Sequence, residues 1–149
     1  MRAVVQRVRN ARVLVDGQVV GEIGPGMLAL IGVARDDGPG DLAYLASKLR
    51  DLRIFEDEAG KMNLALADVG GALLAVSQIT LYGDCRRGRR PSFDAAAGAD
   101  QGRLLFDALV REQRDAGVQV ATGAYQAHMA VELVNDGPVT ILLDSRKAF

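Results

Sequence analysis

The sequence contains one cysteine and one histidine among its 149 residues. A single cysteine excludes an intramolecular disulfide, and one cysteine with one histidine argues against a zinc site built from these residue types. The net charge of -1 creates no overall field that would attract nucleic acid, so any such affinity has to come from a local cluster of charges. No apolar run is long enough to span a membrane, and charges interrupt the N-terminus too early for a signal peptide. We therefore expect a cytoplasmic protein that uses no metal, no cofactor and no membrane.

The apolar content of 49% in 149 residues suits one domain, residues 1–149, which buries most of the surface that the unfolded chain exposes. Short valine-rich strands are expected at the N-terminus, and strands also fill the last third of the chain. The apolar run of residues 27–33 predicts a strand covered on both faces, and residues 72–76 a further buried strand. Leucines at helical spacing predict a helix over residues 42–53, and a second helix is expected over residues 100–116, with Gly117 as a C-cap candidate. This order indicates an α/β fold in which a mixed sheet curls over a second, small sheet and two main helices form one outer layer.

The segment 131–140 joins two apolar, β-prone stretches through Gly137-Pro138. An Asp-Gly pair between apolar stretches predicts a hairpin, because glycine accepts a positive φ without penalty. Pro138 donates no N–H, which leaves it a strand start, a bulge, an edge or a cis peptide. Since X-Pro bonds are cis in only about 5 to 6% of folded cases, the pattern alone favours a hairpin with a trans turn.

Polar residues interrupt an apolar run directly after Val76. If the strand continues, alternation places Ser77 and Ile79 on one face and Gln78 and Thr80 on the other. These residues either mark a strand leaving the core, or supply a hydroxyl and an amide to a pocket that could hold an ester carbonyl or provide a nucleophile. A threonine nucleophile needs a nearby base, and the sequence offers no obvious one.

Four arginines, Arg86, Arg87, Arg89 and Arg90, surround Gly88. Such a cluster is either solvated surface or a binding site for phosphate oxygens, whose affinity would weaken with salt. In a slightly acidic chain, this loop is the expected route to nucleic-acid affinity.

His128 is the single histidine of the chain. Strand alternation over residues 127–134 puts it on a polar face with Glu132, which favours a solvated histidine over a catalytic base. Nothing in the spacing requires Cys85 to meet it as a nucleophilic pair.

Six motifs in order resemble the D-aminoacyl-tRNA deacylase family, and they cover nearly the whole chain. Two residues depart from the family pattern: position 79 is Ile where Phe is frequent, and position 125 is Tyr where Phe is expected. The motifs are Gln6-Arg7-Val8, Gly60-Lys-Met-Asn63, Ser77-Gln-Ile-Thr-Leu81, Arg90-Pro-Ser-Phe93, Gly123 with Tyr125 and Met129, and Asn135-Asp-Gly-Pro-Val-Thr140.

The resemblance implies a homodimer of three-layer β/β/α subunits that hydrolyses the ester between a D-amino acid, or glycine, and the 3′-terminal adenosine of tRNA. It implies that Gly137-Pro138 is a cis dipeptide, braced by Arg7, which reaches into the partner subunit's pocket. Its carbonyls would hold the amino group of the substrate and leave no room for an L side chain. The implied roles of the remaining residues are the ester end for Ser77, Gln78 and Thr80, the adenine pocket for Tyr125 and Met129, further substrate contacts for Ile79 and Asn135, and tRNA phosphate contacts for Arg86, Arg87, Arg89 and Arg90.

For the mechanism, the resemblance implies that the 2′-OH of the terminal adenosine assists attack by water. Backbone N–H groups near Ile79 and Thr80 would then hold the developing oxyanion. The alternative mechanism makes Thr80 a covalent nucleophile. Two alternative functions also stay open: a related deacylase with relaxed chirality that removes L-alanine from tRNA, and a non-catalytic RNA- or DNA-binding module that uses the arginine loop.

Overall fold

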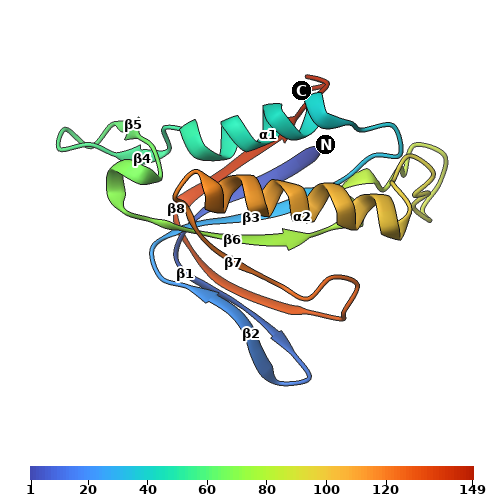
Figure 1. Cartoon of the computed structure of the whole chain (residues 1–149), viewed down its shortest axis with the longest axis horizontal. Helices are drawn as coiled ribbons and strands as arrows, with labels where there is room; N and C mark the ends of the chain where they lie inside the picture. The colour runs from blue at the N-terminus through green and yellow to red at the C-terminus, as the bar shows by residue number, and fades with distance from the viewer.

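Two long strands, β1 (Arg2–Val15) and β8 (Ala130–Asp144), run antiparallel side by side and organise the sheet (Figure 1). The computed structural model describes all residues, 1–149. No helix in it is long and apolar enough to cross a membrane. The other elements are β2 (Gln18–Ile23), β3 (Gly26–Gly32), α1 (Pro39–Asp51), β4 (Phe55–Glu56), β5 (Met62–Leu64), the 3-10 helix η1 (Ala67–Val69), β6 (Ala72–Ser77), the 3-10 helix η2 (Ile79–Tyr82), α2 (Ala99–Asp115) and β7 (Gln119–Thr122).

The predicted three layers are confirmed, and both β layers belong to one curled, six-stranded sheet. The first half of β1 pairs with β3, and β3, β6 and β7 run parallel to one another. The second half of β1 pairs with β2 and bends away, so that β2 folds back over β7. Helices α1 and α2 cover the face of β3 and β6 that points away from β2 (Figure 1). A separate two-stranded sheet is formed by β4 and β5.

The expected N-terminal strands are present as β1 and β2, but β1 is long, with 14 residues, and only β2, with 6 residues, is short. The pairing of β1 with β8 shifts register on both sides of Val8, and there the buried side chains of β1 change face. Ala3 and Val5 pack under the helices, whereas Ala11 and Val13 pack inside the curl. A bulge bends a strand and strengthens its local twist, so one strand can serve both layers.

Strands β3 and β6 are buried on both faces, as expected for residues 27–33 and in keeping with the buried strand expected over residues 72–76. One apolar cluster lies between the sheet and the helices and includes Met27 and Leu73. A second cluster fills the curl and includes Leu28 and Leu74. Because neighbouring residues of a strand point to opposite faces, both strands are apolar throughout and show no polar alternation.

The predicted hairpin at residues 131–140 is wrong, because these residues belong to the single strand β8. Asn135 pairs with Val8 and Thr140 pairs with Gln6, so the residues between them form a bulge opposite Arg7. The missing N–H of Pro138 therefore removes no hydrogen bond from the ladder. The Gly137–Pro138 peptide bond is cis.

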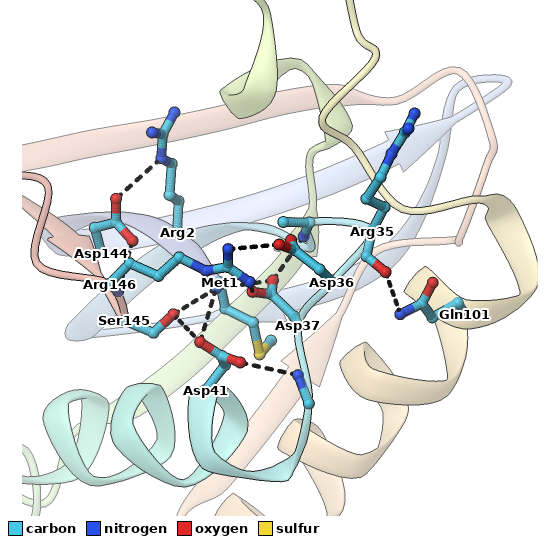
Figure 2. Close-up of polar contacts among 12 residues, drawn as sticks. Met1, Arg2, Arg35, Asp36, Asp37, Asp41, Gln101, Asp144, Ser145 and Arg146 are labelled. Carbon is cyan, nitrogen blue, oxygen red and sulfur yellow. Dashed lines mark hydrogen bonds and ion pairs between the residues drawn. The ribbon is translucent and has the colours of Figure 1, made fainter.

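A polar network holds the loop between β3 and α1 against both ends of the chain (Figure 2). The buried carboxylate of Asp37 accepts a hydrogen bond from the Ala34 amide at 2.6 Å and lies 2.8 Å from the Met1 amine. Arg146 lies 3.3 Å from the same carboxylate. A buried carboxylate with this many donors is held in one position, so the loop that it anchors has a defined geometry.

Gly26 is required where β3 approaches β6. Its φ is +157°, and a Cβ there would overlap the carbonyl oxygen of Ala72 and lie 2.7 Å from the Ala72 nitrogen. We expect Gly26→Ala to lower the free energy of unfolding by at least about 3 kcal/mol, measured by urea denaturation. Gly24→Ala is the matched control, because no atom lies within 4 Å of a Cβ at that position, and we expect a change of less than about 0.5 kcal/mol. Equal stability of the two variants would contradict this prediction.

Candidate active site

A pocket of about 540 Å³ lies where β6 ends, between η2, the first turn of α2 and the segment leading into β8. Its walls come from parts of the sequence that are far apart, and its volume is within the range of small-molecule sites, about 300 to 1,000 Å³. We call it the main pocket. Six predicted site residues line it together: Ser77, Gln78, Ile79, Thr80, Tyr125 and Met129.

The strand alternation predicted for residues 77–80 is wrong. β6 ends at Ser77 after the Gln78 amide donates a last ladder hydrogen bond to the Ile31 carbonyl at 2.7 Å, and η2 begins at Ile79. The turn brings all four side chains to the same pocket. The Gln78 side-chain amide donates to the Thr80 hydroxyl at 3.0 Å. The N–H groups at the start of a 3-10 helix have no acceptor within the helix, so those of Ile79 and Thr80 are free for a ligand.

The aromatic wall of the pocket is fixed in place by α2. The Tyr125 hydroxyl donates to the Ala99 carbonyl at 2.9 Å, and the Arg103 guanidinium lies 5.5 Å from the ring centre. A Cβ on Gly102 would lie 2.7 Å from the Tyr125 hydroxyl, so the glycine makes room for it. A tyrosine is already neutral at pH 7, and burial raises the pKa of Tyr125 further, so its phenol acts as a neutral donor. The hydroxyl that distinguishes Tyr125 from the expected Phe bonds the first turn of α2 at the wall of the pocket.

His128 is a pocket residue that the strand pattern did not predict. It lines the main pocket beside Met129, because β8 begins only at Ala130 and the predicted alternation does not extend to residue 128. The Glu132 carboxylate that was expected near it pairs with Arg12 at 2.7 Å.

Ionisable groups are scarce around the main pocket. Tyr125 and His128 are the only ionisable side chains that line it. Cys85 lines a different cavity, so the structure does not bring it together with His128. No group of three or more His, Cys, Asp or Glu side chains in the chain could hold a metal ion.

Gly137 and Pro138 do not line the main pocket of their own chain. They are exposed on the bulge of β8, opposite Arg7, and Arg7 pairs with Met27 near the start of β3. The pocket lies past the other end of β3, at Val33, so six residues of extended chain, about 20 Å, separate the two. Within a single chain the bulge and the pocket are separate features.

The buried side chain of Arg7 holds the bulge through a hydrogen bond to its backbone. Arg7 is 7% exposed, and its guanidinium donates to the carbonyls of Asp136 and Ile54, both at 2.7 Å. Asn135 closes the bulge, since its side chain accepts from the Val139 amide at 2.8 Å and donates to the Val139 carbonyl at 3.1 Å. These contacts hold the Gly137-Pro138 segment in a defined position on the surface.

A second cavity of about 900 Å³, here called the arginine groove, is lined by Arg2, Arg35, Arg86 and Arg146. Arg86 begins the predicted arginine loop. Its guanidinium forms an ion pair with the Asp84 carboxylate, 2.6 Å away, so its charge is already balanced within the chain. This contact holds the pKa of Asp84 well below its ordinary value. The other three arginines of the loop are exposed and form no ion pair with the chain, namely Arg87, Arg89 and Arg90.

The three-layer fold, and a strand-end pocket that presents hydroxyls, an amide and free N–H groups, are typical of a hydrolase that acts on a small acyl group. The sequence matches over residues 4–144 the family model described as D-Tyr-tRNA(Tyr) deacylase. The chain therefore belongs to the D-Tyr-tRNA(Tyr) deacylase family, whose members are enzymes that hydrolyse an ester bond of aminoacyl-tRNA.

Among individual proteins, the chain is 60% identical to the D-aminoacyl-tRNA deacylase of Anaeromyxobacter dehalogenans and 59% identical to that of Symbiobacterium thermophilum. The alignments cover 100% of this chain, and 100% and 99% of the two relatives. The fold matches a solved structure named c-Myc DNA Unwinding Element Binding Protein, with a TM-score of 0.91, 35% identity, and coverage of 97% of this chain and 98% of the other. A second structure, described as a probable eukaryotic D-amino acid tRNA deacylase, shares the fold at a TM-score of 0.81 and 20% identity, over 96% of this chain and 98% of the other.

Proposed function

We propose that this chain hydrolyses the ester bond between a D-amino acid, or glycine, and the 3′-terminal adenosine of tRNA. It would thereby free mischarged tRNA for translation in the cytoplasm. The observation that carries the proposal is the meeting of Ser77, Gln78 and Thr80 with Tyr125 and Met129 in one pocket. Membership of the deacylase family and the names of the bacterial relatives support it.

The main pocket contains the two kinds of surface that an aminoacylated adenosine requires. Tyr125 and Met129 offer an aromatic face and a polarizable sulfur to the adenine base. Ser77, Gln78 and Thr80 form the polar surface for the ester, and Ile79 adds an apolar surface that is 52% exposed. The free N–H groups of Ile79 and Thr80 would hold the oxyanion that develops when water attacks the carbonyl carbon.

The proton acceptor for the attacking water would be the 2′-OH of the substrate itself. No carboxylate lines the pocket, and the Thr80 hydroxyl accepts a hydrogen bond from Gln78. A hydroxyl that is to attack needs a base to take its proton, whereas Thr80 is bonded to a donor. The pocket residues would then act by positioning and by electrostatic stabilisation.

Chirality would be enforced by Gly137-Pro138 of a second copy in a homodimer. The segment is exposed, lies about 20 Å along the sheet from its own pocket, and is held by Arg7 and Asn135. Strand β8 pairs only with β1, so its other edge is free for a partner. Exposed apolar side chains on β8, Val134 at 46% and Leu142 at 56%, suit an interface. Rejection by a rigid obstacle recognises no particular side chain, so it would serve many D-amino acids.

The proposed function is tested by incubating the protein with D-Tyr-tRNA and L-Tyr-tRNA side by side and following release of free amino acid. We expect cleavage of the D ester with a kcat/KM at least about 100-fold above that of the L ester. Equal cleavage of both, or removal of L-alanine from tRNA, would replace the proposal by a deacylase with relaxed chirality.

A second candidate function is a nucleic-acid-binding module without turnover. The observation in its favour is the solved structure at 35% identity that is named as a DNA-element binding protein. Salt-sensitive binding of RNA or DNA together with no cleavage of any aminoacyl ester would establish it in place of the deacylase.

A further inference from the structure

The main pocket and the arginine groove share one wall. Three segments of the chain line both cavities, each contributing neighbouring residues to the two sides. The three segments follow β3, form η2 and precede α2. Their residues that line the main pocket are Val33, Thr80 and Ala97. Their residues that line the groove are Arg35, Tyr82 and Ala95. A strand of RNA that leaves the main pocket therefore has the groove directly beside it.

Arg35 is the one groove arginine without a carboxylate partner. Arg2 lies 3.3 Å from Asp144, Arg86 lies 2.6 Å from Asp84, and Arg146 lies 2.7 Å from Asp36. Figure 2 shows the Arg35 side chain pointing away from Asp36, Asp37 and Asp144. Three of the four guanidinium groups are thus used by the fold, and the fourth is free to bind a ligand.

The backbone of Arg35 is held although its side chain is free. Its amide donates to the Ala95 carbonyl at 3.0 Å, and its carbonyl accepts from the Gln101 side chain at 2.9 Å. Because the backbone at Arg35 is already ordered, binding of an anion has to fix only the side chain. The conformational entropy lost on binding is therefore smaller than for an arginine on a mobile loop.

The charged side chains around the groove that form no ion pair carry a net positive charge. The free cations are Arg35 and, on the adjoining loop, Arg87, Arg89 and Arg90, whereas Asp94 is the only lining carboxylate without an ion pair. Guanidinium groups suit phosphate oxygens, to which they can donate two parallel hydrogen bonds.

We propose that the arginine groove binds backbone phosphates of the RNA strand whose 3′ end occupies the main pocket, and that Arg35 is a phosphate contact. The proposal rests on the proposed function, because it takes the ligand of the main pocket to be the end of a tRNA. Arg87, Arg89 and Arg90 extend the contact along the strand.

Arg86 has a different role in this arrangement, that of a positioning residue. Its backbone amide and its guanidinium both donate to the Asp84 carboxylate. Asp84 in turn exchanges two backbone hydrogen bonds with Ser92, at 2.8 and 2.9 Å, which close the base of the loop. Arg86 thereby fixes the point from which the three free arginines extend.

The test compares two substrates, D-Tyr-tRNA and D-tyrosyl-adenosine, which carries the ester but no phosphate. For Arg35→Ala we expect unchanged hydrolysis of D-tyrosyl-adenosine and weaker use of D-Tyr-tRNA. The log-log slope of tRNA affinity against salt concentration should flatten by about 0.7 per lost contact. The ratio of wild-type to variant affinity should therefore be about 2.6-fold smaller at 200 mM salt than at 50 mM salt. Arg35→Lys keeps the charge and should keep most of the slope.

Two further variants sharpen the comparison. Arg111→Ala is the matched control, because Arg111 is exposed and unpaired but lies on α2 outside the groove, and we expect the wild-type slope. Asp94→Asn removes the unpaired carboxylate of the groove and should increase tRNA affinity at low salt. Opposite effects at Arg35 and Asp94 with none at Arg111 are the expected pattern.

Binding of uncharged tRNA, measured by fluorescence anisotropy over the same salt range, keeps this test independent of catalysis. A wild-type slope for Arg35→Ala, or an equal loss of activity on both substrates, would overturn the phosphate contact. Failure of the wild-type protein to cleave either D ester would instead refute the proposed function, and the anisotropy slopes would still decide whether the groove binds RNA. A melting temperature within about 2 °C of wild type excludes misfolding as the cause.

Discussion

A D-aminoacyl-tRNA whose terminal adenosine lacks the 2′-OH is expected to be hydrolysed about 10²- to 10⁴-fold more slowly than the normal substrate, the range that a positioned acid or base contributes. The physical reason is the composition of the main pocket. Its lining has no carboxylate, and its threonine hydroxyl accepts a hydrogen bond from Gln78. The ionisable side chains of the lining are Tyr125, whose hydroxyl bonds the Ala99 carbonyl, and the exposed His128. The 2′-OH is adjacent to the ester in the substrate itself, so it is the group best placed to orient the attacking water and share its proton.

Thr80→Ala is the protein-side counterpart of this experiment. It removes the acceptor of the Gln78 amide and leaves the backbone N–H groups of η2 in place, so we expect kcat to fall by no more than about tenfold. Single-turnover rates at saturating enzyme separate the chemical step from binding, and inhibition by the deoxy substrate reports its affinity.

The opposite pattern would reject the substrate-assisted mechanism. An inactive Thr80→Ala together with full activity on the deoxy substrate would make Thr80 the covalent nucleophile. Thr80→Ser is the matched control: it keeps a hydroxyl that can accept from Gln78, so it should stay active under either mechanism and show that an effect of Thr80→Ala comes from loss of the hydroxyl.

Two variants that are each inactive are expected to recover hydrolysis of D-Tyr-tRNA when their subunits are mixed. Thr80→Trp fills the main pocket from an exposed position. Gly137→Val displaces the bulge, because a Cβ there would lie 3.0 Å from the Val139 amide and 3.2 Å from the Arg7 guanidinium. A displacement of about 1 Å can cost about 10²-fold in rate, so each variant alone should be nearly inactive on D-Tyr-tRNA.

In a symmetric dimer each site combines the pocket of one subunit with the bulge of the other. A heterodimer of the two variants then has one intact site, and random mixing should return about a quarter of the wild-type activity. Co-refolded protein is assayed after its subunit composition is measured by mass spectrometry under non-denaturing conditions.

The outcome of the mixing experiment separates the two arrangements of the site. Heterodimers without activity, or a fully active monomer, would show that the bulge does not complete the partner's pocket. The double variant, Thr80→Trp with Gly137→Val in one chain, is the matched control. Mixed with wild type, it yields heterodimers whose sites each contain one defect, so these heterodimers should be inactive. The roughly one quarter of activity that remains in this control comes from wild-type homodimers, whereas in the mixture of the two single variants the activity is carried by the heterodimers.

Several elements could be predicted from local sequence because local physics decides them. The leucine spacing before residue 53 and the glycine after residue 116 mark helices that the structure has at α1 and α2. The apolar run of residues 27–33 indicated a strand buried on both faces, and β3 is one. The family motifs also brought Ser77 and Tyr125 into one predicted site, and both line the main pocket.

The bulge of β8 could not be predicted in the same way. Asp136-Gly137 between apolar stretches suits a hairpin and a bulge equally well, because both need a backbone that departs from the strand conformation. The pairing of Val8 with Asn135 and of Gln6 with Thr140 decides between them. That pairing joins residues more than a hundred positions apart, so no local pattern contains it.

The charges of the arginine loop show the same limit. The four arginines look equivalent in the sequence, but Asp84 engages Arg86, and the free Arg35 comes from a distant loop. An ion pair depends on which side chains meet in space, which the spacing of charges along the chain does not specify.

The sequence by itself determined the class of fold, the helices, the buried strands and the family, since these follow from apolar periodicity and from residue types in a fixed order. The tertiary structure alone decided that β8 forms a bulge and not a hairpin opposite Arg7, that His128 lines the pocket, and that Arg35 stays unpaired beside it. The physical reason is that hydrogen-bond partners, ion pairs and pocket walls form between distant segments, and only the packed chain brings those segments together.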